Sequence, residues 1–361
     1  MDQPAQFAAL LARPEPLLAL APMQDVTDLP FWRLMARYGG PDVYWTEYFR
    51  VHPTSRLEKW ILESVIKNPT GQPAIAQLIG NDIPSLVRAA KELQHYPIAA
   101  VDLNLGCPAP VVYRKCAGGG LLREPARVDG ILGAMREAIG ERGVKFTVKT
   151  RIGFDDPGVF DEFLAIFARH SLDLLTVHGR TVKEMYRTEV HYDYIARAAA
   201  AVPCSVLANG NIHSPARAVE VLTSTGAKGL MIGRGCIRNP WLYGQIRSHL
   251  RGEPVRLPTG RDVLTYIGEL YEATEPPESQ EKFQVEKMKK YLNFLGMGVG
   301  RSAPESALFL NRIRRASARA EFFGICAEYL DHDEPMPLVP FSPDAPIATA
   351  PEAVPETACA L

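Results

Sequence analysis

Residues 101–122 read VDLNLGCPAPVVYRKCAGGGLL, and the fold and the chemistry can both be argued outward from them. An apolar run at 99–105 ends at a Gly-Cys-Pro turn, which is typical of a strand that delivers its last residues onto a stiff loop. The loop carries the thiol of Cys107. Glycines 118–120 then let the chain pass close to a bulky group before the next helix.

Cys107 has a competing interpretation, because a lone cysteine after an apolar run is a small buried apolar side chain in roughly two cases of three. Here the residue lies beyond the strand end, between Gly106 and Pro108, where side chains point at a site rather than into a core. We therefore expect Cys107 to face a ligand. Cys116 lacks this setting, and we expect it to be structural.

The alternation of short strand and helix extends in both directions from this stretch. We expect strands at 17–23, 43–46, 74–79, 99–105, 146–150, 174–178, 205–209 and 229–232, and helices at 31–38, 84–94, 126–139, 160–169, 192–200, 215–223 and 241–250. Eight such units favour a (β/α)8 TIM barrel over an open doubly wound sheet. No G-x-G-x-x-G follows the first strand, which argues against a dinucleotide-binding Rossmann unit.

The remainder of the chain has a different composition. We expect residues 1–250 to form the barrel domain and 251–330 a smaller domain of two to four helices, because that segment contains no strand-like run. The segment 331–361 is rich in proline and alanine and has no Lys or Arg, which predicts a disordered tail.

Composition excludes several classes of protein. The 361 residues are 47% hydrophobic with a formal net charge of -1, as in ordinary globular proteins. The six cysteines form no C-x-x-C pair, which predicts a reducing compartment and no metal site. No secretory signal is evident, and no apolar run approaches the roughly 18 residues that span a membrane. We expect a cytoplasmic monomer.

Polar residues end nearly every predicted strand. Any single one is about three times more often solvated or bonded to a loop than catalytic. In a barrel, however, these ends meet on one face, and so many polar groups there predict a ligand. The strand-end residues are Pro22, Met23, Gln24, Gln77, Asn104, Cys107, Lys149, Arg151, His178, Arg180, Asn209, Gly210, Asn211, Gly233, Arg234 and Gly235.

Strands 7 and 8 end in glycines beside Arg234, where barrels of this kind hold a phosphate. Gln77, Lys149 and His178 would then meet the planar head of a phosphorylated cofactor, where an ammonium stabilises negative charge on a reduced flavin. Flavin mononucleotide (FMN) has both parts, a phosphate for the first site and a planar ring system for the second. A thiol of ordinary pKa, about 8.5, is mostly protonated at pH 7, so Cys107 can act as an acid when a C=C bond is reduced. A nucleophilic thiolate, with Lys149 or His178 as its base, remains the alternative.

At this point the motifs become specific. The chain resembles the tRNA-dihydrouridine synthases over about its first 325 residues, in eight ordered runs: 20–28 (LAPMQDVTD), 46–51 (TEYFRV), 76–82 (AQLIGND), 102–122 (DLNLGCPAP to AGGGLL), 147–156 (TVKTRIGFDD), 176–181 (TVHGRT), 207–212 (LANGNI) and 231–242 (MIGRGCIRNPWL).

The resemblance implies an FMN barrel that reduces a tRNA uridine to 5,6-dihydrouridine at the expense of NADPH. Cys107 would protonate C5 while FMN gives hydride to C6, and Asn104 and Arg180 would hold the uracil edge. It also implies FMN contacts at Pro22, Met23, Gln24, Gln77, Lys149, His178, Asn209, Gly210, Asn211, Gly233 and Arg234. The family's basic residue and Gln after HGRT are replaced by Val182 and Glu184, which leaves local substrate contacts open.

The helical segment supports an RNA partner. Between residues 282 and 319 the sequence has nine Lys and Arg against two Glu, a run that is usually only a solvated face but that favours phosphate contact once the barrel motifs are considered. The aromatic residues interleaved with it are expected to be core. A uridine in folded tRNA must leave its stack to reach a barrel mouth, and Arg50 is a candidate for guiding it.

Three other functions remain open at this level. An FMN barrel acting on a free pyrimidine, as in dihydroorotate oxidation, would explain the thiol but not the basic helical segment. A Schiff-base lyase would use Lys149. A non-enzymatic tRNA-binding protein would have no need of Cys107.

Overall fold

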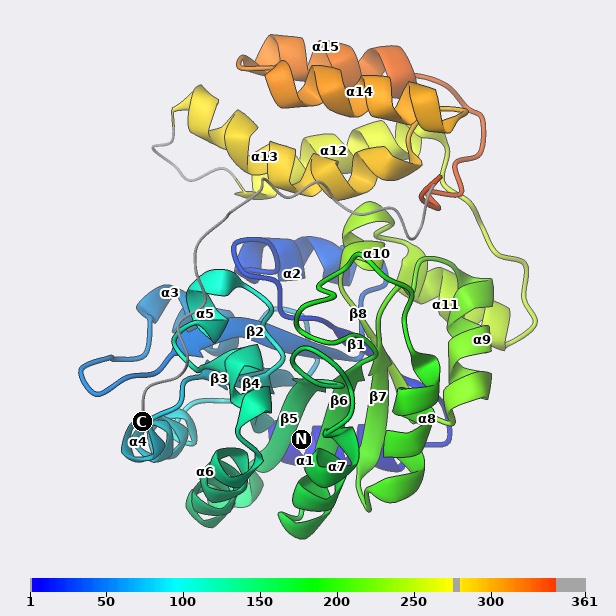
Figure 1. Cartoon of the computed structure of the whole chain (residues 1–361). Coiled ribbons are helices and arrows are strands. Elements are labelled where there is room, and N and C mark those ends of the chain that lie inside the picture. Colours follow the sequence, from blue (N-terminus) through cyan, green and yellow to red (C-terminus); the bar gives the residue numbers. More distant parts are fainter. Residues whose placement is uncertain (1, 275–279, 342–361) are drawn as a thin grey trace.

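The computed structural model describes residues 2–274 and 280–341. Eight parallel strands close into a barrel in chain order, with β1 paired to both β2 and β8 (Figure 1). This confirms the predicted TIM barrel. The strands are β1 (Leu17–Leu20), β2 (Val43–Arg50), β3 (Ala74–Ile79), β4 (Ala100–Leu105), β5 (Lys145–Arg151), β6 (Leu174–His178), β7 (Ser205–Asn209) and β8 (Gly229–Ile232).

The helices between the strands begin where the sequence provides caps. Asp28, Asp82 and Ser214 each accept a hydrogen bond from a backbone N–H of the first turn, which also contains a proline. The helices are α2 (Leu29–Arg37), α3 (Lys59–Ile66), α4 (Ile83–Leu93), α5 (Pro110–Tyr113), α6 (Pro125–Ala138), α7 (Phe160–Arg169), α8 (Tyr192–Ala201), α9 (Pro215–Thr225), α10 (Arg234–Arg238) and α11 (Leu242–Leu250), with 3-10 turns η1 (Gly118–Arg123) and η2 (Glu141–Gly143).

Alternate residues of each strand face two different cores. Leu17 and Ala19 belong to the cluster inside the barrel, whereas Leu18 and Leu20 belong to the larger cluster between the sheet and the outer helices. Inside the barrel the apolar filling occupies the amino-terminal part of the strands. The carboxyl-terminal end is left to the polar residues of the site.

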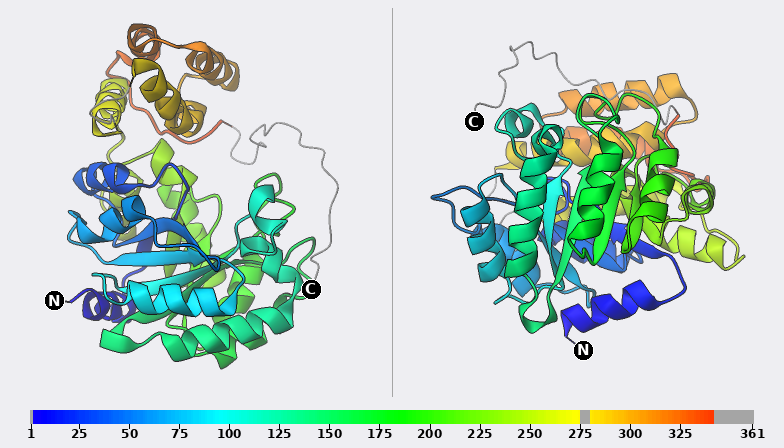
Figure 2. Two further views of the ribbon diagram at one scale, coloured as in Figure 1. Left: turned by 90° about the vertical axis from the view of Figure 1, so that its left-hand side faces the viewer. Right: turned by 60° about the horizontal axis from the view of Figure 1, so that its bottom comes forward.

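Helix α1 (Gln3–Ala12) lies across the amino-terminal end of the barrel (Figure 2). The side chain of Phe7 is fully buried in the inner cluster, and Gln3 Oε1 accepts a hydrogen bond from the N–H of Ala74 at the start of β3, 2.9 Å away. No helix is predicted here from the sequence, although Leu10 and Leu11 follow Phe7 at helical spacing and pack partly buried against the same cluster.

In the described part of the chain, four helices follow the barrel and lie over the carboxyl-terminal ends of its strands (Figure 1). They confirm the predicted helical C-terminal region. Of its aromatic residues that were expected to be core, Tyr291, Phe309 and Phe322 are fully buried, and Phe294 and Phe323 pack partly buried against the core. The helices are α12 (Gly260–Thr274), α13 (Glu281–Leu295), α14 (Ala303–Arg315) and α15 (Arg319–Leu330), with the 3-10 turn η3 (Gly296–Gly298).

The sequence predicts disorder from residue 331 onward, whereas residues 331–341 pack on the helical region. Met336 donates its N–H to Pro258 O at 2.7 Å, and the side chains of Met336 and Leu338 are buried. Composition misses this contact because its partners, such as Pro258, are brought to the segment only by the folded helical region. The rest of the predicted tail, 342–361, lies outside the described residues.

Candidate active site

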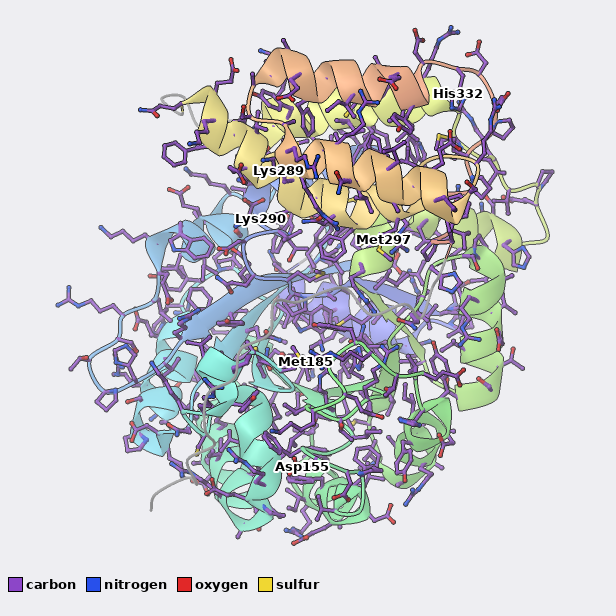
Figure 3. All side chains as sticks on the ribbon, turned by 45° about the horizontal axis from the view of Figure 1, so that its top comes forward. Asp155, Met185, Lys289, Lys290, Met297 and His332 are labelled. Carbon is purple, nitrogen blue, oxygen red and sulfur yellow. The ribbon has the colours of Figure 1, made fainter. Side chains whose placement is uncertain are left out.

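A cavity of about 900 Å³ lies between the carboxyl-terminal ends of the strands and the edge of the helical region. In Figure 3, Met185 lies in the mouth of the barrel, and Lys290 and Met297 lie at the facing edge of the helices; all three line the cavity. Twelve of the predicted site residues line it too: Pro22, Met23, Gln24, Asn104, Cys107, Lys149, His178, Asn209, Gly210, Asn211, Gly233 and Arg234.

Strand register brings these residues into one row. Asn104 on β4 lies opposite Lys149 on β5, Arg151 on β5 lies opposite His178 on β6, and His178 lies opposite Asn209 on β7. Because parallel strands in a barrel end on the same face, residues far apart in the sequence become neighbours around one opening.

The Cys107 loop is held by a chain of buried amides. Gln77 donates Nε2 to Asp102 Oδ2 at 2.7 Å and accepts at Oε1 from Asn104 Nδ2 at 2.8 Å. Asn104 Oδ1 in turn accepts the backbone N–H groups of Gly106, at 3.0 Å, and of Cys107, at 2.9 Å. The orientation of the loop that carries the thiol therefore depends on residues of β3 and β4.

Asp102 anchors this chain from below the cavity. Burial raises its pKa to about 6, although hydrogen bonds from Thr147 Oγ1, at 2.5 Å, and from Gln77 oppose the shift. At neutral pH the group is mostly a carboxylate and only accepts hydrogen bonds. It therefore sets which end of the Gln77 amide points down and which end faces Asn104.

Cys107 carries a free, half-buried thiol on the cavity wall. Burial raises its pKa above the ordinary value, and the nearby cations of Arg151 and Lys149 offset this only in part. The thiol is therefore protonated at neutral pH, which favours the predicted acid over the thiolate alternative.

The glycines after Cys107 pack against the protein itself. A Cβ at Gly119 would lie 2.5 Å from Val182 Cγ2 and 2.7 Å from Cys107 O, and the Gly119 N–H donates to Cys107 O at 3.2 Å. The close approach predicted for 118–120 thus occurs, and the bulky group is the Cys107 loop together with Val182 from the β6–α8 loop. The turn supports the thiol from behind.

Lys149 and His178 are two basic side chains on the cavity wall, and the pKa of each lies below its ordinary value. Burial, and then Arg151, lower the pKa of Lys149 to about 8, and Lys149 has no hydrogen-bond or ion-pair partner within 2–274 and 280–341. Burial and the surrounding Lys and Arg residues bring the pKa of His178 well below its ordinary value, so its imidazole is neutral. Among the described residues its buried Nδ1 has no hydrogen-bond partner either, as expected of an atom that binds a ligand.

Arg151, a strand-end residue without a specific predicted role, lies on the cavity wall. Its Nε donates to Gly106 O at 2.9 Å, and its Nη1 donates to the carbonyls of Thr181, at 2.8 Å, and Met185, at 2.9 Å. It joins the Cys107 loop to the β6–α8 loop. The sequence places Arg151 at a strand end, two residues after Lys149 on the same strand face, but it does not reveal that the guanidinium bonds to two loops.

The opposite end of the cavity is built for an anion. Arg234 donates Nη2 to Asn211 Oδ1 at 2.8 Å, and its guanidinium carbon lies 4.7 Å from the ring centre of Tyr186. Gly210 has a φ of 130°, which favours glycine, and a Cβ at Gly233 would lie 3.1 Å from Met23 Sδ. The backbone can therefore approach a phosphate closely beside a fixed guanidinium.

Three predicted site residues do not line the cavity. Gln77 lies fully buried beneath it in the amide chain described above. Arg180 is fully buried and donates from Nε and Nη2 to Thr188 O, with the Nε bond at 2.7 Å. Arg50 is exposed at the end of β2, with its guanidinium carbon 5.6 Å from the ring centre of Tyr48, which does line the cavity.

The helical side of the cavity was not predicted in detail. Arg238 on α10 is buried and donates Nε to Phe294 O on α13 at 3.0 Å, which joins the barrel to the helical region. A basic run in a sequence does not reveal which helix face meets the barrel. The cavity residues from this side are Lys290, Asn293, Phe294, Met297, Arg314 and Pro340.

Within the described ranges no group of three or more His, Cys, Asp and Glu is arranged to hold a metal ion. In the same ranges, no helix is long and apolar enough to cross a membrane.

These features define a class: a TIM barrel whose carboxyl-terminal mouth holds a thiol, a neutral histidine and several cations beneath a helical cover. Within that class, the family model for dihydrouridine synthases (Dus) matches residues 19–321, and the chain belongs to this family.

Two relatives agree with this family assignment, and a solved structure shares the fold. The chain is 31% identical over 318 residues to tRNA-dihydrouridine(16) synthase of Neisseria meningitidis serogroup B, with 86% of this chain and 94% of that protein covered. It is 36% identical over 239 residues to tRNA-dihydrouridine synthase B of Pseudomonas aeruginosa, with coverages of 65% and 70%. Histamine dehydrogenase from Rhizobium sp. 4-9 shares the fold, with a TM-score of 0.52 at 14% identity, covering 73% of this chain and 51% of that chain.

Proposed function

We propose that this protein reduces a uridine of tRNA to 5,6-dihydrouridine, with FMN bound in the barrel mouth and NADPH as the source of electrons. The observation that carries the proposal is the position of Cys107 on one wall of a cavity whose other walls hold an anion site and a neutral, unpartnered His178. Family membership supplies the reaction, and the tRNA named in the relatives supplies the substrate class.

The residues present fit FMN. Arg234, Gly210 and Gly233 offer a guanidinium and close backbone to its phosphate, and Lys149 and His178 offer an ammonium and an unpaired ring nitrogen to its flat head. The bound flavin supplies the hydride that adds to C6 of the uracil. Pro22, Met23, Gln24, Asn209 and Asn211, which also line the cavity, complete the proposed binding set. Gln77 supports the site from below.

Cys107 is the proposed acid. As hydride adds to C6, the electron pair of the C5=C6 bond takes the thiol proton at C5, and the thiolate that remains is reprotonated from solvent. Burial keeps the thiol protonated, and the cations of Arg151 and Lys149 stabilise the thiolate after transfer. Asn104 has one amide N–H without an assigned acceptor and lines the cavity, which supports its predicted contact with the uracil edge.

Positive charge at the mouth supports an RNA substrate over a free pyrimidine. Lys290 and Arg314 line the cavity from the helical region, and Arg238 lines it from α10. These cations would bind the phosphates of an RNA, which a free base does not have. Because the thiol lies inside this mouth, the uridine must leave its stack to reach it. Arg50 and Arg180 remain proposals for substrate contact, although neither lines the cavity.

The test compares Cys107→Ala with Cys204→Ala, a half-buried thiol outside the cavity. The Cys107 variant should purify with its flavin spectrum intact and lose at least about a hundredfold of its dihydrouridine formation in tRNA, the usual scale for an acid catalyst. The Cys204 variant should equal the parent. Unchanged activity of Cys107→Ala, or turnover of free uridine or orotate as fast as tRNA, would contradict the proposal.

A further inference from the structure

A second hollow opens beside the active-site cavity, between the barrel and α13. It measures about 790 Å³, within the roughly 300–1,000 Å³ typical of small-ligand sites. We call it the Trp60–Phe283 groove, because Trp60 on α3 lines it from the barrel and Phe283 on α13 lines it from the helical region. It shares Asp25, Lys290, Asn293 and Arg314 with the cavity, so the two are contiguous.

The two aromatic side chains that line this groove are unusually exposed. Trp60 is 50% exposed and Phe283 is 67% exposed, whereas the aromatic residues expected to be core in the helical region are buried or partly buried. Flat apolar rings next to cations are the surfaces on which unpaired nucleobases stack, and this stacking tolerates any base.

The acidic residues in the groove do not repel a phosphate chain. Lys287 Nζ lies 3.2 Å from Asp28, Lys290 Nζ lies 3.5 Å from Asp25, and Glu286 pairs with Lys289 at 2.5 Å. The fourth acid is Glu47, which accepts a hydrogen bond from the N–H of Asp25. Burial and the nearby Asp28 raise the pKa of Glu47 to about 8, so it is neutral at pH 7.

Arg314 is therefore a positive charge in excess of the lysine–carboxylate pairs of the groove. Its Nε donates to the neutral Asn293 at 2.9 Å, and both side chains lie where the groove meets the cavity. A phosphate at this junction would lie between a base in the groove and a base in the barrel mouth. Because the two hollows are contiguous at Arg314 and Asn293, neighbouring nucleotides of one strand could occupy both.

We propose that the Trp60–Phe283 groove binds the unpaired nucleobase next to the uridine that enters the barrel, with Arg314 at the phosphate between them. This inference rests on the proposed function and names a second base site for the same RNA. A polypeptide partner would also find exposed aromatic rings here, and the experiment separates that outcome by removing one base.

The first measurement is tRNA binding by the FMN-bound protein. Trp60→Leu and Phe283→Leu should each weaken binding about tenfold, the scale of one lost base stack. Trp60→Phe, which keeps a ring, should bind nearly as the parent does. Matched controls are Ile66→Ala, on the same helix as Trp60 and 53% exposed, and Leu308→Ala, 55% exposed on α14; neither residue lines the groove or the cavity, and neither change should alter binding.

The second measurement is specific to stacking. Of the four tryptophans Trp60 is exposed, whereas Trp32 and Trp45 are fully buried and Trp241 is half-buried. The fluorescence of Trp60 should therefore be quenched when a base of the bound tRNA stacks on it. Trp60→Phe should remove that quenching. A tRNA made abasic next to the mapped dihydrouridine should bind the parent about tenfold more weakly than intact tRNA binds the parent. For Trp60→Leu, the abasic and the intact tRNA should bind equally well.

Equal losses of binding to abasic tRNA in the parent and in Trp60→Leu would overturn the inference, as would parent-like binding by both leucine variants. These results differ from a failure of the proposed function, in which the parent itself forms no dihydrouridine in tRNA. Loss of binding in the leucine variants without any effect of the missing base would assign the rings to another partner and would also overturn it.

Discussion

Lys149 obtains its properties from its place in the barrel. Its ammonium lies among Arg151, His178 and the thiol of Cys107, and burial together with Arg151 lowers its pKa to about 8. A surface lysine stays charged to about pH 10. The site therefore contains a cation that can be removed by a modest rise in pH, while the guanidinium groups around it keep their charge.

We predict that FMN affinity falls as pH rises through about 8. The ammonium is present below the pKa of Lys149 and becomes a neutral amine above it, and the binding of an anionic cofactor raises that pKa, so affinity drops by up to about tenfold per pH unit over this window. Flavin fluorescence titrations between pH 7 and 9.5 measure the effect. Lys149→Arg should be nearly flat over the same range, since arginine keeps its charge. A slope as steep in this variant as in the parent would assign the titration elsewhere.

The site residues that sequence predicts well are those whose position depends on the strand end alone. Cys107, Lys149 and His178 line the cavity because each lies within two residues of the carboxyl end of a strand in a closed barrel. The positions of Gln77 and Arg180 are harder to predict, because a strand-end side chain can form hydrogen bonds with neighbouring residues instead of facing the cavity. Gln77 bonds to Asp102 and Asn104, and Arg180 bonds to Thr188 O, contacts that depend on the exact register and loop path.

At the scale of elements, α13 connects the helical region to the β1–α2 loop, which also contains cavity residues. Tyr291 Oη donates to Val26 O at 3.0 Å, its ring stacks on Phe31 at 5.9 Å, and Lys287 pairs with Asp28, the N-cap of α2. The same loop contains Pro22 and Met23, which line the cavity. A displacement of α13 would therefore also move residues of the cavity wall.

We predict that Tyr291→Phe lowers the free energy of unfolding by about 1–3 kcal/mol, because the carbonyl of Val26 loses its buried donor while the ring packing remains. Urea denaturation followed by circular dichroism measures it. Tyr96→Phe is the control, since Tyr96 packs against the core without a hydrogen bond from its hydroxyl among the described residues. Equal stability of the two variants would show that this bond contributes nothing to docking.

The sequence predicted most elements because each carries a local signal. The strands are apolar runs, and α4 and α9 begin at a capping Asp or Ser followed by proline. Helices α1, α3, α5 and α10 are not among the predicted ones. Helix α1 does carry a local signal, a capping Asp2 and a proline in its first turn, whereas α3 has no side-chain cap and depends on tertiary contacts.

For the molecule as a whole, residues 331–341 act as a strap across the helices. Leu338 is buried and lies against Gly298, where a Cβ would approach the Leu338 backbone to 2.9 Å, and Arg261 pairs with Asp331 and Asp333. The exposed ion pairs contribute little on their own. Most of the stabilisation comes from the buried Met336 and Leu338.

We predict that Leu338→Ala destabilises the protein by about 2–5 kcal/mol, the range for a buried leucine replaced by alanine. Thermal unfolding measures it, and Leu308→Ala, on the exposed face of α14, serves as the control with little expected change. A melting temperature for Leu338→Ala equal to that of the control would mean that the strap adds nothing to the fold.

The position of α1 has a practical consequence for anyone who handles this protein. Residue 2 lies beneath the barrel, at the end opposite the opening, whereas Pro340 lies on the cavity wall. An affinity tag or a surface linker fused ahead of α1 should leave the path of a large nucleic acid clear. A fusion that follows residue 341 directly would begin beside the cavity opening and would hinder the approach of the nucleic acid.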